Sequence, residues 1–149
     1  MSLPTRAAVV TEALSWQGTP FQSGARLKGA GVDCGNFLAA VYSATGFTLP
    51  SPLPQLPPNW FLHRDDGRFA QVIGEFAPEY KLSEHQPQPG DIILVKAGRD
   101  WAHAAVVVAW PSVVGAAAGF VVTLWRNLNT SPQYTARPIR FFDPWSKRP

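Results

Sequence analysis

The chain has 149 residues, a length typical of one domain, with 46% hydrophobic and 15% charged residues. This composition excludes an intrinsically disordered chain, and no apolar run reaches the ~20 residues that span a bilayer. The net charge of +3 is too small to predict nucleic-acid binding, which requires a concentrated basic face. We therefore expect residues 1–149 to form a single domain that binds neither nucleic acid nor membrane.

The first half of the chain is predicted to be helical. An apolar stripe at helical spacing predicts a first helix over residues 5–17. A second helix is expected to begin at Asp33 or Cys34 and to end at Gly46, and a third covers residues 69–76. The five prolines of residues 49–58 exclude a helix interior or a central strand there, so we expect a surface excursion.

The second half is rich in Val, Ile, Phe and Trp and is predicted to form strands. Four apolar runs are separated by turn residues: Asp91–Lys96, Trp101–Trp110, Phe120–Arg126 and Arg137–Phe142. Helices first and an antiparallel sheet afterwards is the α+β pattern.

Cys34 is the single cysteine, which excludes an intramolecular disulfide and a zinc site with two thiolates. At the start of a helix, a thiol lies beside unpaired N–H groups that lower its pKa and favour the nucleophilic thiolate. Gly31 and Gly35 leave room for a substrate to approach the backbone. The alternative is a buried thiol that packs as a small hydrophobe.

A nucleophilic thiol requires a base, and the chain offers three histidines. His63 and His85 lie in polar, loop-like stretches, whereas His103 opens an apolar strand. Alternation places His103 on the same face as Ala105 and Val107. An imidazole at that strand end could meet a helix N-terminus, and the alternative is a core histidine bonded to a carbonyl.

Five segments in this order resemble the NlpC family of cell-wall cysteine peptidases over about residues 5–127: Gly18–Phe21, Gly31–Phe37, Gly46–Pro50, Gln88–Leu94 and Trp101–Val107. The resemblance implies a permuted papain-like α+β fold with N-terminal helices packed on a C-terminal antiparallel sheet. It also implies that Cys34 is the nucleophile and His103 the base. No cofactor is implied, and no metal-ligand spacing is present.

The resemblance further implies a substrate-binding role for Asp33, Phe21 and Gly35. In the family, polar residues beside the nucleophile help to hold the amino end of the stem peptide. Phe21 stands where the family usually has tyrosine, and Gly35-Asn36 replaces the usual Ser-Gly. Two hydroxyl groups are therefore missing near the site, which affects substrate preference more than the chemistry.

The family places a polar residue on the strand after the base, where it fixes the imidazole tautomer. If the hairpin turns near residues 114–115, the start of the His103 strand pairs with residues 125–127. Asn127 is then the predicted third catalytic residue, with Thr123 and Asn129 as alternatives. A second interpretation is that Asn127 merely caps a turn with Asn129.

These residues predict a cysteine peptidase that hydrolyses peptidoglycan stem peptides or muropeptides, often between D-glutamate and a diamino acid. The proline-rich insertion resembles that of peptidases encoded among phage tail and gene-transfer-agent genes, so tail proteins are candidate partners. Residues 1–6 lack the apolar stretch of a secretory signal, so we expect a cytoplasmic protein or one carried to the wall on a phage-like particle. The alternatives are a weakly active or inactive structural protein of a phage-like tail, and an acyltransferase or thioesterase on a related fold.

Overall fold

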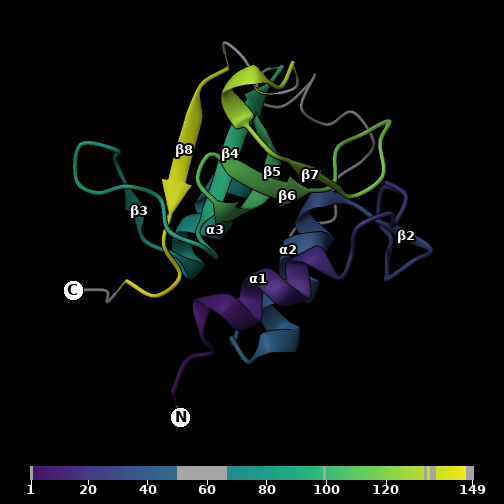
Figure 1. The fold of residues 1–149 in the computed structure, drawn as a ribbon, viewed down its shortest axis with the longest axis horizontal. Helices are drawn as coiled ribbons and strands as arrows, with labels where there is room; N and C mark the ends of the chain where they lie inside the picture. The colour runs from purple at the N-terminus through teal and green to yellow at the C-terminus, as the bar shows by residue number, and fades with distance from the viewer. Residues whose placement is uncertain (1, 50–66, 99, 133, 135–136, 147–149) are drawn as a thin grey trace.

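The structure is a computed structural model in which an antiparallel sheet lies against a layer of helices (Figure 1). It describes residues 2–49, 67–98, 100–132, 134 and 137–146. Most of the predicted proline-rich excursion, residues 50–58, and His63 lie outside the described residues.

The three helices form at the predicted places: α1 (Arg6–Leu14), α2 (Cys34–Thr45) and α3 (Arg68–Phe76). The Thr5 hydroxyl caps α1 by accepting the Ala8 amide at 3.0 Å. The first helix is shorter than predicted, because residues 15–18 form a turn that ends at Gly18 with a φ of +87°. Within the described part of the chain, no helix combines the length and the apolar character that a bilayer crossing requires.

The main sheet is antiparallel, with the strand order β3-β8-β4-β5-β6-β7. Its strands are β3 (Glu79–Tyr80), β4 (Ile92–Ala97), β5 (Asp100–Ala109), β6 (Ser112–Gly115), β7 (Thr123–Trp125) and β8 (Ile139–Phe142). A separate pair, β1 (Arg26–Leu27) and β2 (Gly31–Val32), lies just before α2. Helices followed by an antiparallel sheet confirm the predicted α+β class.

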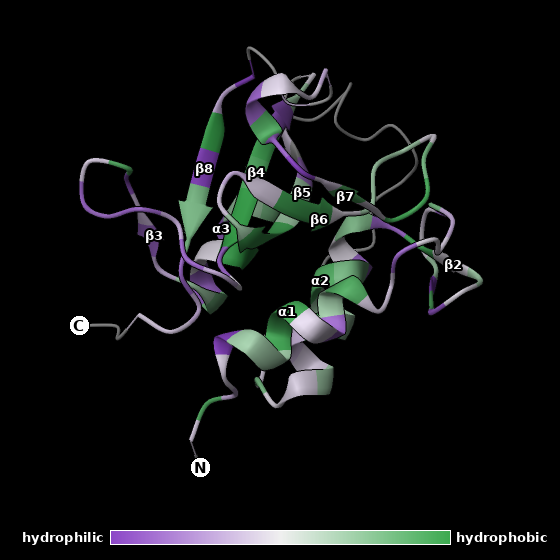
Figure 2. Cartoon of the chain, in the orientation of Figure 1, coloured by the Kyte–Doolittle hydropathy of each residue, from purple (hydrophilic) through white to green (hydrophobic). Residues whose placement is uncertain are grey.

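The sheet has a hydrophobic core on each face. Ile92 and Leu94 of β4 pack in the core shared with the helices, which we call the helix-side core. Ile93 and Val95 point the other way, into a smaller core that contains Tyr134, which we call the far core. Figure 2 shows the apolar residues concentrated on the central strands and on α1 and α2. Burial of each such side chain stabilises the fold by about 1.5–3 kcal/mol.

The predicted hairpin near residues 114–115 is wrong. The strand β5 turns at Trp110-Pro111 into β6, with Ala109 paired to Ser112, so β6 lies between β5 and β7. Trp125 therefore pairs with Val113 instead of lying opposite the start of β5. Proline fits a tight turn between two strands.

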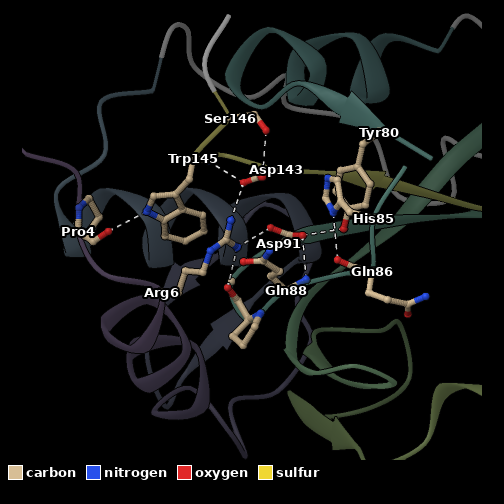
Figure 3. Close-up of polar contacts among 12 residues, drawn as sticks. Pro4, Arg6, Tyr80, His85, Gln86, Gln88, Asp91, Asp143, Trp145 and Ser146 are labelled. Atoms are coloured by element: carbon tan, nitrogen blue, oxygen red, sulfur yellow. Dashed lines mark hydrogen bonds and ion pairs between the residues drawn. The ribbon is translucent and has the colours of Figure 1, made fainter. Parts of the chain in front are cut away.

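A buried polar cluster joins the N-terminus, the start of β4 and the C-terminal segment (Figure 3). The Asp91 carboxylate accepts from Arg6 Nη1 at 2.7 Å and from the Tyr80 hydroxyl at 2.6 Å. Arg6 Nη2 also pairs with Asp143 at 3.0 Å, and its guanidinium lies 4.3 Å from the Trp145 ring centroid. These contacts hold α1 on the sheet and so fix the layer from which α2 presents Cys34.

Candidate active site

Cys34 occupies the first position of α2, as the sequence predicts. One oxygen of Asp33 caps the helix by accepting the Asn36 amide at 2.8 Å. The other oxygen accepts the Gly24 amide at 2.7 Å, which holds the preceding loop beside the helix start. Cys34 is partly buried and packs against the helix-side core.

Three backbone amides face the Cys34 sulfur: its own, that of Gly35 and that of Ala104 on β5. Two of them belong to the first turn of α2, whose N–H groups have no partner within the helix. The third reaches the sulfur from the sheet. The Ala104 amide therefore places the thiol against β5, at the residue next to His103.

The regular pairing of β5 with β6 ends close to Ala104. The backbone of Val107 hydrogen-bonds to Gly90 and Asp91, on the β4 side of β5. Successive residues of a strand direct their amides to opposite sides, so the amide of Ala104, three residues away, faces the β6 side. The last paired residues there are Val106 and Val114. Beyond them a Cβ on Gly115 would lie 2.8 Å from the Ala104 oxygen, so glycine permits this close approach.

His103 lies on the far-core face of β5, as alternation predicts for a residue in phase with Ala105 and Val107. Its Nε2 is 2.7 Å from the Tyr134 hydroxyl. The edge of the Trp125 ring meets the imidazole at a centroid distance of 6.1 Å. The ring is therefore fixed from the far-core side, while the thiol lies against the neighbouring Ala104.

Burial governs the pKa of both groups. Desolvation, with the nearby Asp33 carboxylate, raises the pKa of Cys34 to about 12, although the three amides act in the opposite direction. Desolvation and the Arg137 guanidinium lower the pKa of His103 to about 4. The expected depression of the thiol pKa is thus wrong, because burial shifts the pKa of each group in the direction that favours its uncharged form.

We expect iodoacetamide to alkylate Cys34 slowly at neutral pH, because the reactive thiolate forms only well above the pKa of an ordinary thiol. The rate should rise continuously from pH 6 to pH 9, and unfolding in urea should increase the rate at pH 7. Mass spectrometry of samples quenched at set times measures the alkylation rate at each pH and in urea. A rate that reaches a plateau near pH 6–7, and loses it in His103→Ala, would instead reveal a resting thiolate–imidazolium pair.

The three predicted substrate-binding residues lie in different settings. Asp33 uses both oxygens in the cap and the loop described above. The Gly35 amide faces the sulfur. The Phe21 backbone amide donates to the Phe120 carbonyl at 3.1 Å, and its partly buried ring packs against the helix-side core. Their roles in substrate binding stay predictions.

Asn127 does not take the predicted place beside the base. Its amide oxygen accepts the Asn129 amide at 3.0 Å and caps the short 3-10 helix η2 (Leu128–Thr130). The Thr123 hydroxyl donates to the Val121 carbonyl at 2.7 Å. The group at His103 Nε2 is Tyr134, which the sequence analysis missed because it lies in a loop without periodicity.

His85 is the other histidine that the structure describes. His85 stacks on Tyr80 at a centroid distance of 3.9 Å, with its Nδ1 3.0 Å from the Gln86 oxygen, so it belongs to the cluster around Asp91 (Figure 3). Among the described residues, no three His, Cys, Asp or Glu side chains gather where they could hold a metal ion.

Solved structures share this fold. The NlpC/p60 domain of the peptidoglycan hydrolase SagA superposes with a TM-score of 0.61 at 19% identity, covering 91% of this chain and 97% of that domain. An NlpC/P60 family protein from Bacillus cereus gives 0.64 at 19% identity, covering 93% of this chain and 40% of that protein. RipD from Mycobacterium tuberculosis, described as a non-catalytic, peptidoglycan-binding NlpC/p60 protein, gives 0.54 at 15% identity, covering 92% and 95%.

Among curated proteins, none matches the chain significantly. The profile of the NlpC/P60 family, however, matches residues 16–135. This match covers most of the chain and includes Cys34, His103 and Tyr134. The family that the sequence motifs resemble is therefore confirmed: the chain belongs to the NlpC/P60 family.

Proposed function

We propose that this protein is a cysteine peptidase that hydrolyses peptide bonds in peptidoglycan stem peptides. The observation that carries the proposal is the amide of Ala104 at the Cys34 sulfur. It sets the thiol at the start of α2 against the residue beside His103 on β5, which supports a role for the two side chains as nucleophile and base. The family is consistent with this chemistry.

The pKa shifts of the two groups favour a mechanism in which charge appears only during the reaction. As the Cys34 sulfur attacks the scissile carbonyl carbon, its proton passes to His103, and a tetrahedral intermediate forms. His103 then returns the proton to the leaving amine, and the C–N bond breaks to leave a thioester. Water, deprotonated by His103, attacks the thioester carbonyl and releases the free acid and the thiol.

The helix start stabilises the charge that develops on the sulfur. The amides of Cys34, Gly35 and Ala104 already face the sulfur in the resting site, so they need no reorganisation as negative charge appears there. A transferred proton would also set an imidazolium beside the new thiolate, and the two opposite charges would stabilise each other.

The bond that we propose joins D-glutamate to a diamino acid, as the motif resemblance implies. Asp33 and Gly35 flank the nucleophile in the chain, and together with Phe21 they are the proposed contacts for the stem peptide. Delivery by a phage-like particle rests on the proline-rich stretch alone and stays a prediction.

Product analysis tests the proposal. Purified peptidoglycan with diaminopimelate or lysine stems is incubated with the wild-type protein and with Cys34→Ala, and the soluble fragments are identified by mass spectrometry. We expect fragments with a new amino terminus on the diamino acid, absent with Cys34→Ala. Binding of both proteins to the wall without new termini would contradict hydrolysis and would favour a non-catalytic role, as described for RipD.

A further inference from the structure

The Tyr134 hydroxyl is a buried polar group whose partner is the base. Tyr134 is 2% exposed, and its hydroxyl is 2.7 Å from His103 Nε2. A buried hydroxyl without a hydrogen bond is costly, so this contact is a requirement of the fold as well as a feature of the site.

Neighbouring rings fix the relative positions of the two groups. Trp125 on β7 meets Tyr134 edge-on, with centroids 5.2 Å apart and planes at 76°. It also meets His103 edge-on, with planes at 88°. The backbone of Tyr134 is held by its amide, which donates to Ser131, and by its carbonyl, which accepts from Arg137. The hydroxyl therefore has little freedom to leave the imidazole.

This contact decides which ring nitrogen is left for the thiol. Because Nε2 faces Tyr134, Nδ1 is the nitrogen that remains to take the Cys34 proton. A neutral imidazole can accept a proton at Nδ1 only if its own proton is on Nε2. In that tautomer Nε2 donates to the phenol oxygen, which can accept while it keeps its own hydrogen.

We propose that Tyr134 is the positioning residue of the site, which holds His103 in the Nε2–H tautomer with Nδ1 free to accept the thiol proton. The assigned tautomer and its importance for catalysis rest on the proposed peptidase function, whereas the contact between Tyr134 and His103 does not. Tyr134 thus does what the sequence assigned to Asn127, with a phenol oxygen in place of an amide oxygen. Both acceptors are neutral, so neither stabilises the imidazolium as strongly as a carboxylate.

Two measurements test this role in wild type, Tyr134→Phe and Tyr42→Phe. Tyr134→Phe removes only the hydroxyl and keeps the ring against Trp125. Tyr42→Phe is the matched control, because Tyr42 is equally buried but its hydroxyl donates to the Gly90 carbonyl at 2.5 Å. Nitrogen-15 NMR of the imidazole reports the tautomer of His103, and stem-peptide hydrolysis reports kcat and KM.

We expect the Nε2–H tautomer in wild type and in Tyr42→Phe, and a mixture of tautomers in Tyr134→Phe. The kcat of Tyr134→Phe should fall roughly 10- to 100-fold, with KM within about 2-fold, because a correctly oriented base contributes mainly to the chemical step. Asn127→Ala should keep the wild-type tautomer.

A wild-type spectrum with the proton on Nδ1 would overturn the proposal, whether or not the variants fold. An unchanged tautomer and an unchanged kcat in Tyr134→Phe would overturn it as well. If wild type releases no stem-peptide fragments, the proposed function fails, yet the spectra still decide whether Tyr134 sets the tautomer.

Discussion

Cys34→Ser should lower the rate of stem-peptide hydrolysis by at least about 1000-fold, because loss of a nucleophile removes the covalent route entirely. A serine hydroxyl is far harder to deprotonate than a thiol. The neighbouring base is also weak, since burial and Arg137 lower the pKa of His103 to about 4. The helix-start amides cannot compensate for that difference. The measurement is the release of soluble fragments from purified peptidoglycan per unit time.

The fold and the affinity for the wall serve as controls for this variant. Sulfur and oxygen differ little in size, so the urea midpoint of Cys34→Ser should match that of wild type. Co-sedimentation with insoluble peptidoglycan should also be retained. Undiminished hydrolysis by Cys34→Ser would remove the basis for the peptidase assignment.

The largest loss of stability is expected for Asp91→Ala. The Asp91 side chain has no exposed surface and accepts from Arg6, the Tyr80 hydroxyl and the Gln88 amide. Alanine leaves all three donors without this acceptor, which should lower the free energy of unfolding by about 3–5 kcal/mol. Urea titration with an unchanged m-value measures the difference.

Asp91→Asn and Glu79→Gln separate the causes of the stability loss expected for Asp91→Ala. Burial raises the pKa of Asp91, so its negative charge is itself costly to bury. Most of the stability loss in Asp91→Ala should therefore come from the donors that are left without an acceptor. Asp91→Asn keeps one acceptor oxygen and should therefore cost less than Asp91→Ala. Glu79→Gln removes a partly exposed ion pair with Arg140 and should cost less than about 1 kcal/mol. Equal losses in Asp91→Ala and Glu79→Gln would show that the cluster does not anchor the fold.

Local signals were enough to predict the helices, the place of Cys34 at a helix start and the face of the strand on which His103 lies. The capping residue Asp33 and the apolar spacing after it identify the start of α2, and that start places Cys34. Alternation along a long apolar strand gives the face of His103. Each of these features depends on residues close together in the sequence.

The predictions that the structure corrects concern features that depend on contacts between distant segments. The short strand β6 carries only Val113 and Val114 between a proline and a glycine, too little for a period to be visible. Because β6 was not predicted, the predicted register of β7 was wrong. The partner predicted for His103 depended on that register. Tyr134 comes from a loop, and nothing in its local sequence shows that tertiary packing turns its hydroxyl to the imidazole.

The two cores of the sheet support the proposed catalytic pair from opposite faces. Cys34 packs against the helix-side core, whereas His103 contacts Tyr134 and Trp125 on the far-core side. A packing defect on one side of the sheet therefore shifts one partner and leaves the other where it was. Alignment of the Cys34 sulfur with the His103 ring would thus depend on both cores. We expect a cavity in either core, even far from the site, to lower the rate of the proposed hydrolysis by changing the distance between sulfur and nitrogen.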